Sequence, residues 1–445
     1  MTPNDVAQKL AAFGNPLDRA TAQALDAADP LAHFRDQFMI ADPDTCYLDG
    51  NSLGRLPKAT VATVNSFLTD EWGTQLVDGW AHWIDQATDA GDILGKVCLG
   101  AAAGQTLVQD TTSVNFYQAC VAAINARPGR KTVIIDAANF PTDRFILQGI
   151  AKQLGLNLIT LNNDGTGGPG AADIATTDEL VTPELLAPFL NDDVALVTLQ
   201  LIHYRSGAQP NVKAITDLCR ANGTLVVWDA SHAVGSVDLR FDEWGIDLAV
   251  GCTYKYLNAG PGAPAWIYVR KELQNQIGVP IQGWFAQDKQ FEMGPFFEPT
   301  TTEMRRFQIA SPSIIGIRMV QSSLRMIEEA GIGAIAAKAQ LGTELMLALF
   351  DAWLVPLGFS LITPRNPDKR GGHISIVHTD AKKIAAALRT MKNVVPDFRT
   401  PSGIRLAIAP LPTSFTEVYD GFARLRDLVE SREYLNLQDN GSRVT

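Results

Sequence analysis

Short apolar segments alternate with helix-like segments through the middle of this 445-residue chain, and that alternation constrains its fold more than any other feature. Strands that are apolar on both faces need helices on both sides, which is typical of a parallel sheet. The predicted strands are Thr132–Asp136, Leu158–Leu161, Val194–Leu201, Thr224–Asp229, Leu248–Cys252 and Trp266–Val269. The predicted helices among them include Val114–Ala126, Asp143–Leu154, Pro183–Leu190 and Val212–Ala221.

The ends of the chain have a different pattern. Residues 3–28 are alanine-rich and predict short helices, and Leu56–Trp72 predicts a helix with a proline near its start. After about residue 321 the chain turns helical, most clearly over Gly331–Phe350, and then mixes helix and strand signals around Gly372–Val377 and Ile404–Ile408. A chain of this length exceeds one ordinary domain. We therefore expect a large domain over 56–320 and a small α+β domain built from 1–55 and 321–445.

Two charged residues stand at the ends of neighbouring predicted strands. Asp229 closes one strand, and Lys255 follows the next between Tyr254 and Tyr256. Taken alone, such a lysine is usually a solvated loop residue, and Asp-x-x-His is usually a turn or helix cap. Together, in this order, they favour pyridoxal phosphate, with Lys255 forming the Schiff base and Asp229 keeping the pyridine nitrogen protonated.

At these residues the chain resembles the kynureninase family. The segment Asp229-Ala-Ser-His232-Ala-Val-Gly is followed by Tyr254-Lys255-Tyr-Leu-Asn-Ala-Gly. Further matching segments are Tyr47-Leu-Asp-Gly-Asn-Ser-Leu-Gly54, Thr111-Thr-Ser-Val-Asn115, Asn139-Phe-Pro-Thr-Asp143, Gly283-Trp-Phe285 and Pro401-Ser-Gly-Ile-Arg405. The resemblance runs from about residue 45 to about residue 415. It implies an α/β, aminotransferase-like (fold type I) architecture and hydrolysis of L-kynurenine, or its 3-hydroxylated form, to the anthranilate and L-alanine.

The resemblance also implies cofactor ligands. Thr112 and Ser113 would bind the phosphate at a helix N-terminus, although a Thr/Ser run there is also an ordinary cap. Phe140 would stack on the pyridine ring, and Asp143 would hydrogen-bond near the edge of that ring. His232 would lie beside the cofactor, with a buried histidine satisfied by backbone as the alternative.

Tyr254 would bind phosphate and transfer protons by the same resemblance. Adjacent strand residues point to opposite faces, so Tyr254 and Lys255 reach one site only if the strand ends before them. The catalytic residues implied are thus Lys255, Tyr254 and Asp229. His203 receives no role, and no function is drawn from the Gly- and Asp-rich stretch at 162–173, which predicts a surface loop.

A second set of residues is implied for the substrate and for a partner chain. Arg405 would bind the substrate carboxylate with two parallel hydrogen bonds, near Asn51 and Ser52. Trp80, in an aromatic-rich segment, would line the pocket for the aryl ring. Trp284 and Ser311 match segments that reach the cofactor phosphate of the neighbouring subunit in the family, which implies a homodimer with shared sites.

Net charge, apolar runs and cysteine spacing limit which partners and which cellular compartment we expect for this protein. The net charge of −11 and the pI near 5.1 argue against nucleic acid or an anionic membrane as the main partner. No uninterrupted apolar run reaches the roughly 18 residues of a membrane span, and the N-terminus lacks a signal-peptide pattern. The five cysteines show no paired or metal-ligand spacing. We expect a cytoplasmic enzyme with reduced thiols and no metal.

Other functions on the same fold remain to be weighed. A cysteine desulfurase needs a reactive thiol late in the chain, and no cysteine follows Cys252. An aminotransferase needs the same Lys, Asp and Arg and is the main alternative. A non-catalytic sensor would not need all of Lys255, Asp229 and Arg405. The residues leave open the preference between kynurenine, 3-hydroxykynurenine and other substituted rings, and the pathway that the enzyme serves.

Overall fold

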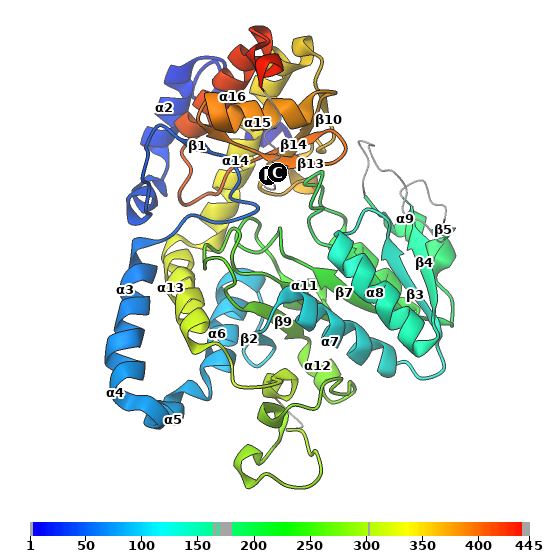
Figure 1. Ribbon diagram of the computed structural model, residues 1–445. Coiled ribbons are helices and arrows are strands. Elements are labelled where there is room, and N and C mark those ends of the chain that lie inside the picture. Colours follow the sequence, from blue (N-terminus) through cyan, green and yellow to red (C-terminus); the bar gives the residue numbers. More distant parts are fainter. Residues whose placement is uncertain (1–2, 163–166, 169–179, 301–302, 438–445) are drawn as a thin grey trace.

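The computed structural model describes residues 3–162, 167–168, 180–300 and 303–437. Figure 1 shows a lower body around a large sheet and an upper body around a smaller one, with the long helix α14 (Ile332–Leu349) running into the upper body. Most of the buried apolar side chains of the lower body form one core, and those of the upper body form a second.

The large sheet has eight strands in the order β2-β9-β8-β7-β6-β3-β4-β5. Its central strands are parallel: β3 (Thr132–Asp136), β4 (Asn157–Leu161), β6 (Val194–Gln200), β7 (Leu225–Asp229) and β8 (Leu248–Gly251). The strands β3, β6, β7 and β8 are buried along their whole length, as expected for strands covered on both faces. The carboxyl ends of these parallel strands therefore share one edge of the sheet.

Two antiparallel strands extend this sheet. The strand β9 (Ala265–Val269) pairs antiparallel with β8 and with β2 (Thr106–Gln109). The sequence predicts β9 but not β2, because β2 is only four residues long and begins and ends with polar residues, Thr106 and Gln109, both of which are buried. Because β9 is antiparallel to both β8 and β2, the strand β2 runs in the same direction as β8. The carboxyl end of β2 therefore also lies at the shared edge.

The helices lie close to their predicted positions. Those next to the central strands are α7 (Thr112–Asn125), α8 (Pro141–Leu154), α9 (Pro183–Leu186) and α10 (Val212–Ala221). The predicted helix at 56–72 is α3 (Lys58–Ser66) followed by a π-helical turn, Phe67–Trp72. Helices α6 (Gln86–Leu94) and α13 (Ile314–Ala330) complete the packing around the lower core.

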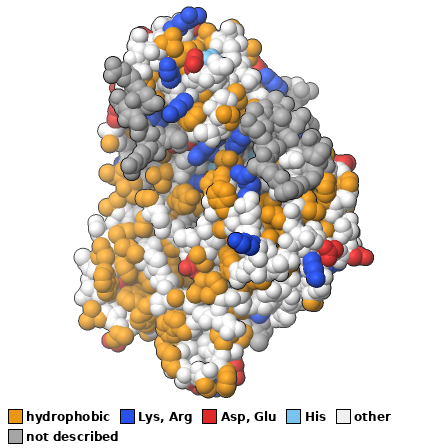
Figure 2. Space-filling view, turned by 45° about the vertical axis from the view of Figure 1, so that its right-hand side comes forward, with side chains coloured by type: hydrophobic (Ala, Val, Ile, Leu, Met, Phe, Trp, Pro, Cys, Tyr) orange, Lys and Arg blue, Asp and Glu red, His pale blue; other side chains and the backbone are white. Residues whose placement is uncertain are grey.

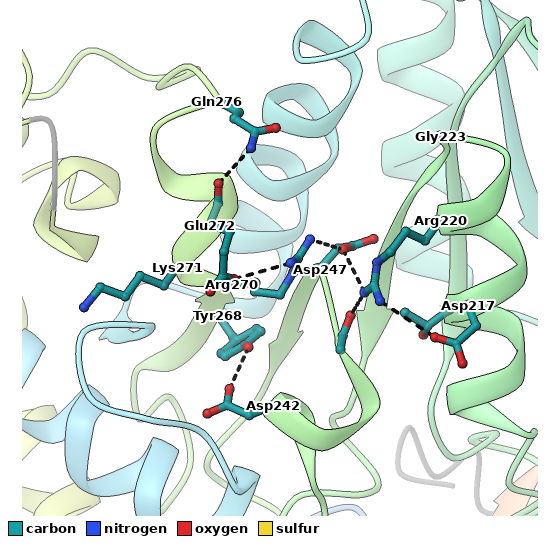
Figure 3. A network of polar contacts seen from close by, with 12 residues as sticks. Asp217, Arg220, Gly223, Asp242, Asp247, Tyr268, Arg270, Lys271, Glu272 and Gln276 are labelled. Carbon is teal, nitrogen blue, oxygen red and sulfur yellow. Dashed lines mark hydrogen bonds and ion pairs between the residues drawn. The ribbon is translucent and has the colours of Figure 1, made fainter.

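A polar network closes the amino edge of the sheet, opposite the ends just described. Asp247, which precedes β8, is buried and pairs with Arg220 at 3.4 Å and with Arg270 at 3.1 Å (Figure 3). Two partners compensate for the burial of one carboxylate. This network ties α10 and the end of β9 to the sheet and lies away from the candidate site.

The second core combines the two ends of the chain. The antiparallel sheet β10-β11-β14-β13 comprises Ser360–Leu361, His373–Val377, Gly403–Ala407 and Asp397–Arg399. It is joined by α1 (Pro3–Ala11), α2 (Arg19–Ala28), α15 (Ala381–Met391), α16 (Phe415–Glu430) and the paired strands β1 (Cys46–Tyr47) and β12 (Val394–Val395). The division at residues 55 and 320 stays a prediction. Leu31, Phe34 and Phe38 pack in the lower core although they precede residue 55, and α14 passes from one core to the other between Ile335 and Leu341.

One helical run in the structure is long and apolar enough for a membrane span, although the sequence contains no uninterrupted apolar run of that length. The run is Ile332–Leu357, and 56% of its apolar stretch is buried inside the protein. Its sequence is not an uninterrupted apolar run, because Lys338 and Glu344 lie within it. Both are paired, Lys338 with Asp29 at 2.7 Å and Glu344 with Arg370. These features are those of a core helix. Of the predicted loop at 162–173, only Asn162 and the two-residue strand β5 (Gly167–Gly168) fall within the described residues.

Candidate active site

The shared edge of the large sheet collects the predicted cofactor residues. Phe140 follows β3, Asp229 ends β7, and Lys255 follows β8. Because β8 ends at Gly251, Tyr254 and Lys255 lie in the turn beyond it, where strand alternation no longer separates them. The condition set by the sequence for both residues to reach one site is therefore met.

Lys255 occupies a confined position. Its Nζ lies 3.2 Å from Nε2 and 3.3 Å from Nδ1 of His232, and 6.0 Å from the centroid of the Phe140 ring. The centroid of the Tyr254 ring is 5.9 Å away. Burial lowers the pKa of Lys255, and the positive charges of Arg405 and Arg399 add to this effect. A larger fraction of the amine is consequently neutral, as a nucleophilic lysine requires.

Asp143 and Asp229 meet next to Lys255. Both carboxyl groups are buried, and a side-chain hydrogen bond joins them. Burial raises the pKa of Asp143 well above its usual range, and the charge of Asp229 raises it further, so Asp143 holds the proton of the pair. The other oxygen of Asp143, Oδ2, has no hydrogen-bond partner among the described residues. The pair thus offers one carboxylate and one buried neutral acid.

Phe140 presents its ring close to this pair. It is the residue before α8, whose first residue is Pro141, and the Asn139 side chain accepts a hydrogen bond from its backbone N–H at 2.7 Å. The ring of Tyr204 contacts it edge-on, at 5.2 Å between centroids and an interplanar angle of 88°. These contacts fix the ring beside Lys255, in a position suited to stacking on a flat cofactor.

His232 is buried beside the cationic side chains of Lys255 and Arg405. Burial lowers its pKa well below the ordinary value, and Lys255, Arg405, His373 and Arg399 lower it further. The His373 ring lies 5.7 Å away, between centroids. The backbone-satisfied alternative from the sequence does not describe this residue, because its ring nitrogens face Lys255 and Arg405.

The N-terminus of α7 provides an anion-binding position at the end of β2. Thr111 is the capping residue, and its hydroxyl accepts from the N–H of Val114 at 3.3 Å. Thr112 and Ser113 are the first two residues of the helix and are half-buried. Their hydroxyls are therefore not used by the cap, and their backbone N–H groups belong to the first turn, where phosphate groups bind.

Arg405 enters the site from the upper body, where Figure 1 shows β14 above the large sheet. It is buried, and its Nε and Nη2 both donate to Asp397, its register partner on β13. Nη2 also donates to Ser52 Oγ at 3.0 Å, and Nη1 donates to the Tyr204 carbonyl. The edge of the guanidinium expected to bind substrate with two parallel hydrogen bonds is thus bound to Asp397 in this structure.

The segment 49–54 contacts this arginine through Ser52. Asn51 is completely buried, and neither side-chain atom has a hydrogen-bond partner among the described residues. Burial raises the pKa of Asp49 to about 6. A Cβ on Gly54 would come within 2.4 Å of the Lys255 carbonyl oxygen, so only glycine permits this close docking.

Three predicted residues lie elsewhere on the single chain. Trp80 packs edge-on against Trp83 and Phe285, at 5.7 and 5.9 Å, in the short helix α5 (Trp80–Trp83). Trp284 is 40% exposed, and Ser311 is exposed. In the described part of the chain none of the three has a hydrogen bond or ring contact with Lys255, Thr112 or Ser113.

Sequence reasoning missed several residues of the site: Asp397, Arg399, Tyr204, His373 and Asp49. A strand with charges two residues apart, as at 397 and 399, was an available signal. His203, left without a role, pairs with Asp136 at 3.0 Å, with both side chains buried. Because Asp136 ends β3 shortly before Phe140 and His203 precedes Tyr204, the pair links the two segments that carry these rings.

The residues present fit pyridoxal phosphate. A buried lysine with a lowered pKa, a carboxyl pair, an aromatic ring and a helix N-terminus converge at one edge of the sheet. The unpartnered atoms of Asn51 and Asp143 are buried polar groups for which a bound molecule would provide partners. Among the described residues, no group of three His, Cys, Asp or Glu side chains is placed to hold a metal ion.

Solved structures with similar folds define the class. A cysteine desulfurase from Thermococcus onnurineus has a TM-score of 0.75, covers 90% of this chain and 98% of its own, and is 16% identical. A structure of a C–S lyase with glycine linked covalently to its pyridoxal phosphate has a TM-score of 0.73, covers 88% and 99%, and is 17% identical. The chain has the aminotransferase-like, fold-type-I architecture of pyridoxal-phosphate-dependent enzymes.

Sequence relatives identify the branch within that class. The kynureninase of Pseudomonas fluorescens is 32% identical over 423 residues, covering 93% of this chain and 96% of its own. The kynureninase of Deinococcus radiodurans is 33% identical, covering 94% and 98%. Residues 335–425 match the family described as the kynureninase C-terminal domain. The chain belongs to the kynureninase family.

Proposed function

We propose that this protein is a pyridoxal-phosphate-dependent hydrolase that cleaves L-kynurenine, or 3-hydroxy-L-kynurenine, to the corresponding anthranilate and L-alanine. Family membership supports the reaction. The observation that carries the cofactor assignment is the position of Lys255 Nζ, 3.2 Å from His232 and beside Phe140, at the strand edge that also holds Asp229. The desulfurase-like fold does not favour sulfur chemistry, because fold alone does not assign function and all five cysteines are buried.

Each residue has a defined part in this proposal. Pyridoxal phosphate, when bound, supplies an electron sink for cleavage of a carbon–carbon bond. Asp229 keeps the pyridine nitrogen protonated, Phe140 orients the ring, and Thr112 and Ser113 hold the phosphate. Asp143 stays neutral and donates a hydrogen bond.

Lys255 and Tyr254 handle protons. The lowered pKa of Lys255 leaves its amine free to accept the proton from the substrate Cα. Burial raises the pKa of Tyr254, so its phenol keeps its proton and can donate it in the later steps. Arg405, with Ser52 and Asn51 nearby, orients the substrate carboxylate. This orientation of the reacting groups reduces the entropic cost of the reaction.

The reaction is tested with the holoenzyme and L-kynurenine, by following anthranilate fluorescence and quantifying L-alanine. Wild-type protein and the variant Lys271→Ala, which removes an exposed lysine of the same body, should form both products. The variant Lys255→Ala should lose the visible absorption of the bound cofactor and nearly all turnover. Transfer of the amino group to a keto acid, without anthranilate, would instead favour the aminotransferase.

We also propose that the active form is a homodimer in the cytoplasm. Free, buried cysteines are consistent with a reducing compartment. An apolar surface groove lined by Phe67, Trp72, Leu76, Val77, Trp80, Trp83, Ile314 and Ile315 supports association. Leu76 is 63% and Val77 is 75% exposed, and Figure 2 shows hydrophobic side chains gathered over the lower part of the molecule. Such a surface is unfavourable in water unless a partner covers it.

A further inference from the structure

Three charged side chains stand together on β13 and β14, at the upper wall of the site. Asp397 and Arg399 are two residues apart on β13 and so share one face, and Asp397 is the register partner of Arg405. Asp397 Oδ2 accepts from Nε of Arg399 at 3.0 Å and also from Arg405. One buried carboxylate thus lies between two guanidinium groups.

Arg405 has few donors left for a ligand. A guanidinium carries five N–H groups. Those on Nε and Nη2 are bound to Asp397 and Ser52, and one on Nη1 is bound to the Tyr204 carbonyl. The remaining N–H lies on Nη1, which is 3.4 Å from His232 Nε2. A carboxylate taken from water into an enclosed site needs several hydrogen bonds, and Arg405 offers it one.

Arg399, in contrast to Arg405, has most of its N–H donors left for a ligand. Only its Nε is bound, so among the described residues neither Nη group has a hydrogen-bond partner. Its side chain is 32% exposed, whereas that of Asp397 is 2% exposed. The charge of Arg399 acts on Lys255 and His232, and it lowers the pKa of both. Arg399 therefore lies near the space that these two residues line, with a free fork of two donors.

The balance of charges on this wall of the site also favours a bound carboxylate. Two guanidinium groups share one carboxylate, and Asp49, whose charge also acts on Arg405, has its own partner in Arg389 at 3.6 Å. Among the described residues, one positive charge on this wall of the site is thus left without a paired carboxylate, as a site for one substrate carboxylate requires.

We propose that Arg399 is a second substrate-binding residue, whose two Nη groups take the α-carboxylate of the amino-acid substrate while Arg405 supplies its remaining N–H. The identity of that substrate rests on the proposed function. The planar fork of arginine matches the two oxygens of a carboxylate, and Asp397 holds the fork in place through Nε. The competing explanation is that Arg399 serves only to neutralise Asp397.

Substrates with and without the carboxylate separate these explanations. The holoenzyme is assayed with L-kynurenine and with its α-carboxamide, in the wild type, Arg399→Gln and Arg365→Gln. Arg365 is a matched control, since it is an exposed arginine of the same body paired with Asp351. Arg399→Gln should lower kcat/KM for the acid at least tenfold, mainly through KM, and should change that for the amide by no more than about twofold. Arg365→Gln should change neither.

Binding without turnover provides an independent measurement. Titration with L-alanine and L-alaninamide, followed by the visible absorption of the bound cofactor, gives dissociation constants even if kynurenine is not the substrate. The wild type should prefer L-alanine, and Arg399→Gln should lose most of that preference while keeping its thermal midpoint and cofactor absorption. Equal losses for acid and amide, an unchanged preference, or a wild type that shows no preference would overturn the proposal. Absence of anthranilate with this preference intact would contradict only the proposed function.

Discussion

A side-chain hydrogen bond joins Asp143 and Asp229 at the base of the candidate site, and its proton lies on Asp143, because burial and the charge of Asp229 raise the pKa of Asp143 well above its usual range. Two adjacent carboxyl groups cannot both ionise at little cost in a buried position. We therefore expect different roles for the two acids beside the pyridine ring: Asp143 as a neutral hydrogen-bond donor and Asp229 as the charged partner of the ring nitrogen.

This difference predicts unequal effects of the same substitution. Asp143→Asn replaces a neutral donor with another neutral donor and should keep kcat/KM within about tenfold. Asp229→Asn removes the charge that pairs with the pyridine nitrogen. Loss of one partner of a buried charge pair costs about 2–5 kcal/mol, so kcat/KM should fall by more than tenfold. Cofactor affinity, measured by equilibrium dialysis, should follow the same order. Equal losses in the two variants would contradict the assignment of the proton.

The pair Arg405 and Asp397 allows stability and activity to be separated. Arg405→Leu should lower kcat/KM at least tenfold and also lower the free energy of unfolding by about 3–5 kcal/mol, because a buried carboxylate loses its main partner. The double variant Arg405→Leu/Asp397→Leu should recover much of the stability and none of the activity. Denaturant unfolding and steady-state kinetics measure the two effects. Recovery of activity in the double variant would show that Arg405 serves the fold and not the substrate.

Asp49 predicts a pH dependence of stability. Burial and the charge of Asp397 raise its pKa from the ordinary 3.8 to about 6, against the opposing effects of Ser52, Arg405 and Arg389. The folded state binds this proton more tightly than the unfolded state does, so the stabilising contribution of the protonated group is lost as the pH rises from 3.8 through about 6. Asp49→Asn should therefore stabilise the protein more at pH 8 than at pH 5, by about 1–2 kcal/mol, since one pKa unit is worth about 1.36 kcal/mol.

Urea unfolding at the two pH values measures this difference. The control is Asp351→Asn, which alters an exposed carboxylate paired with Arg365. A gain for Asp49→Asn that is the same at both pH values would show that the pKa of Asp49 is not raised.

Trp80 predicts a change in substrate preference. An indole offers stacking but no acceptor for the proton of a ring hydroxyl, whereas a neutral imidazole has an acceptor nitrogen that can form this hydrogen bond, worth about 0.5–1.5 kcal/mol. Trp80→His should shift the ratio of kcat/KM values about three- to tenfold toward 3-hydroxykynurenine. Trp72→His, a variant of an exposed residue in the same groove, should leave the ratio unchanged. An unchanged ratio in both variants would mean that Trp80 only packs against Trp83 and Phe285.

The shared site is tested by mixing two inactive variants, Lys255→Ala and Trp284→Ala. If Trp284 and Ser311 act on the cofactor of the partner chain, random exchange should restore about a quarter of wild-type activity, because half of the dimers are mixed and each has one intact site. Subunit exchange is verified by mass spectrometry of the mixed dimers. Confirmed exchange without activity would rule out ligands supplied by the partner.

Much of the site was predictable because its parts follow strands in the sequence. Buried parallel strands read as apolar runs, and the residues after each run, such as Phe140, Asp229 and Lys255, gather at one edge by geometry alone. The same reasoning placed Thr112 and Ser113 at a helix N-terminus. Local sequence therefore predicted the strands β3, β4, β6, β7, β8 and β9 of the large sheet and the residues that follow them, but not β2, β5 or the order in which the strands pair.

Only the tertiary structure decided how the second body completes the site. The pairing of Asp397 with Arg405 depends on strand register, and their contact with Ser52 joins positions 353 residues apart. Which of the two carboxyl groups, Asp143 or Asp229, holds the proton depends on burial. These features arise from packing between segments distant in the chain, and neither composition nor local periodicity encodes which distant partners meet.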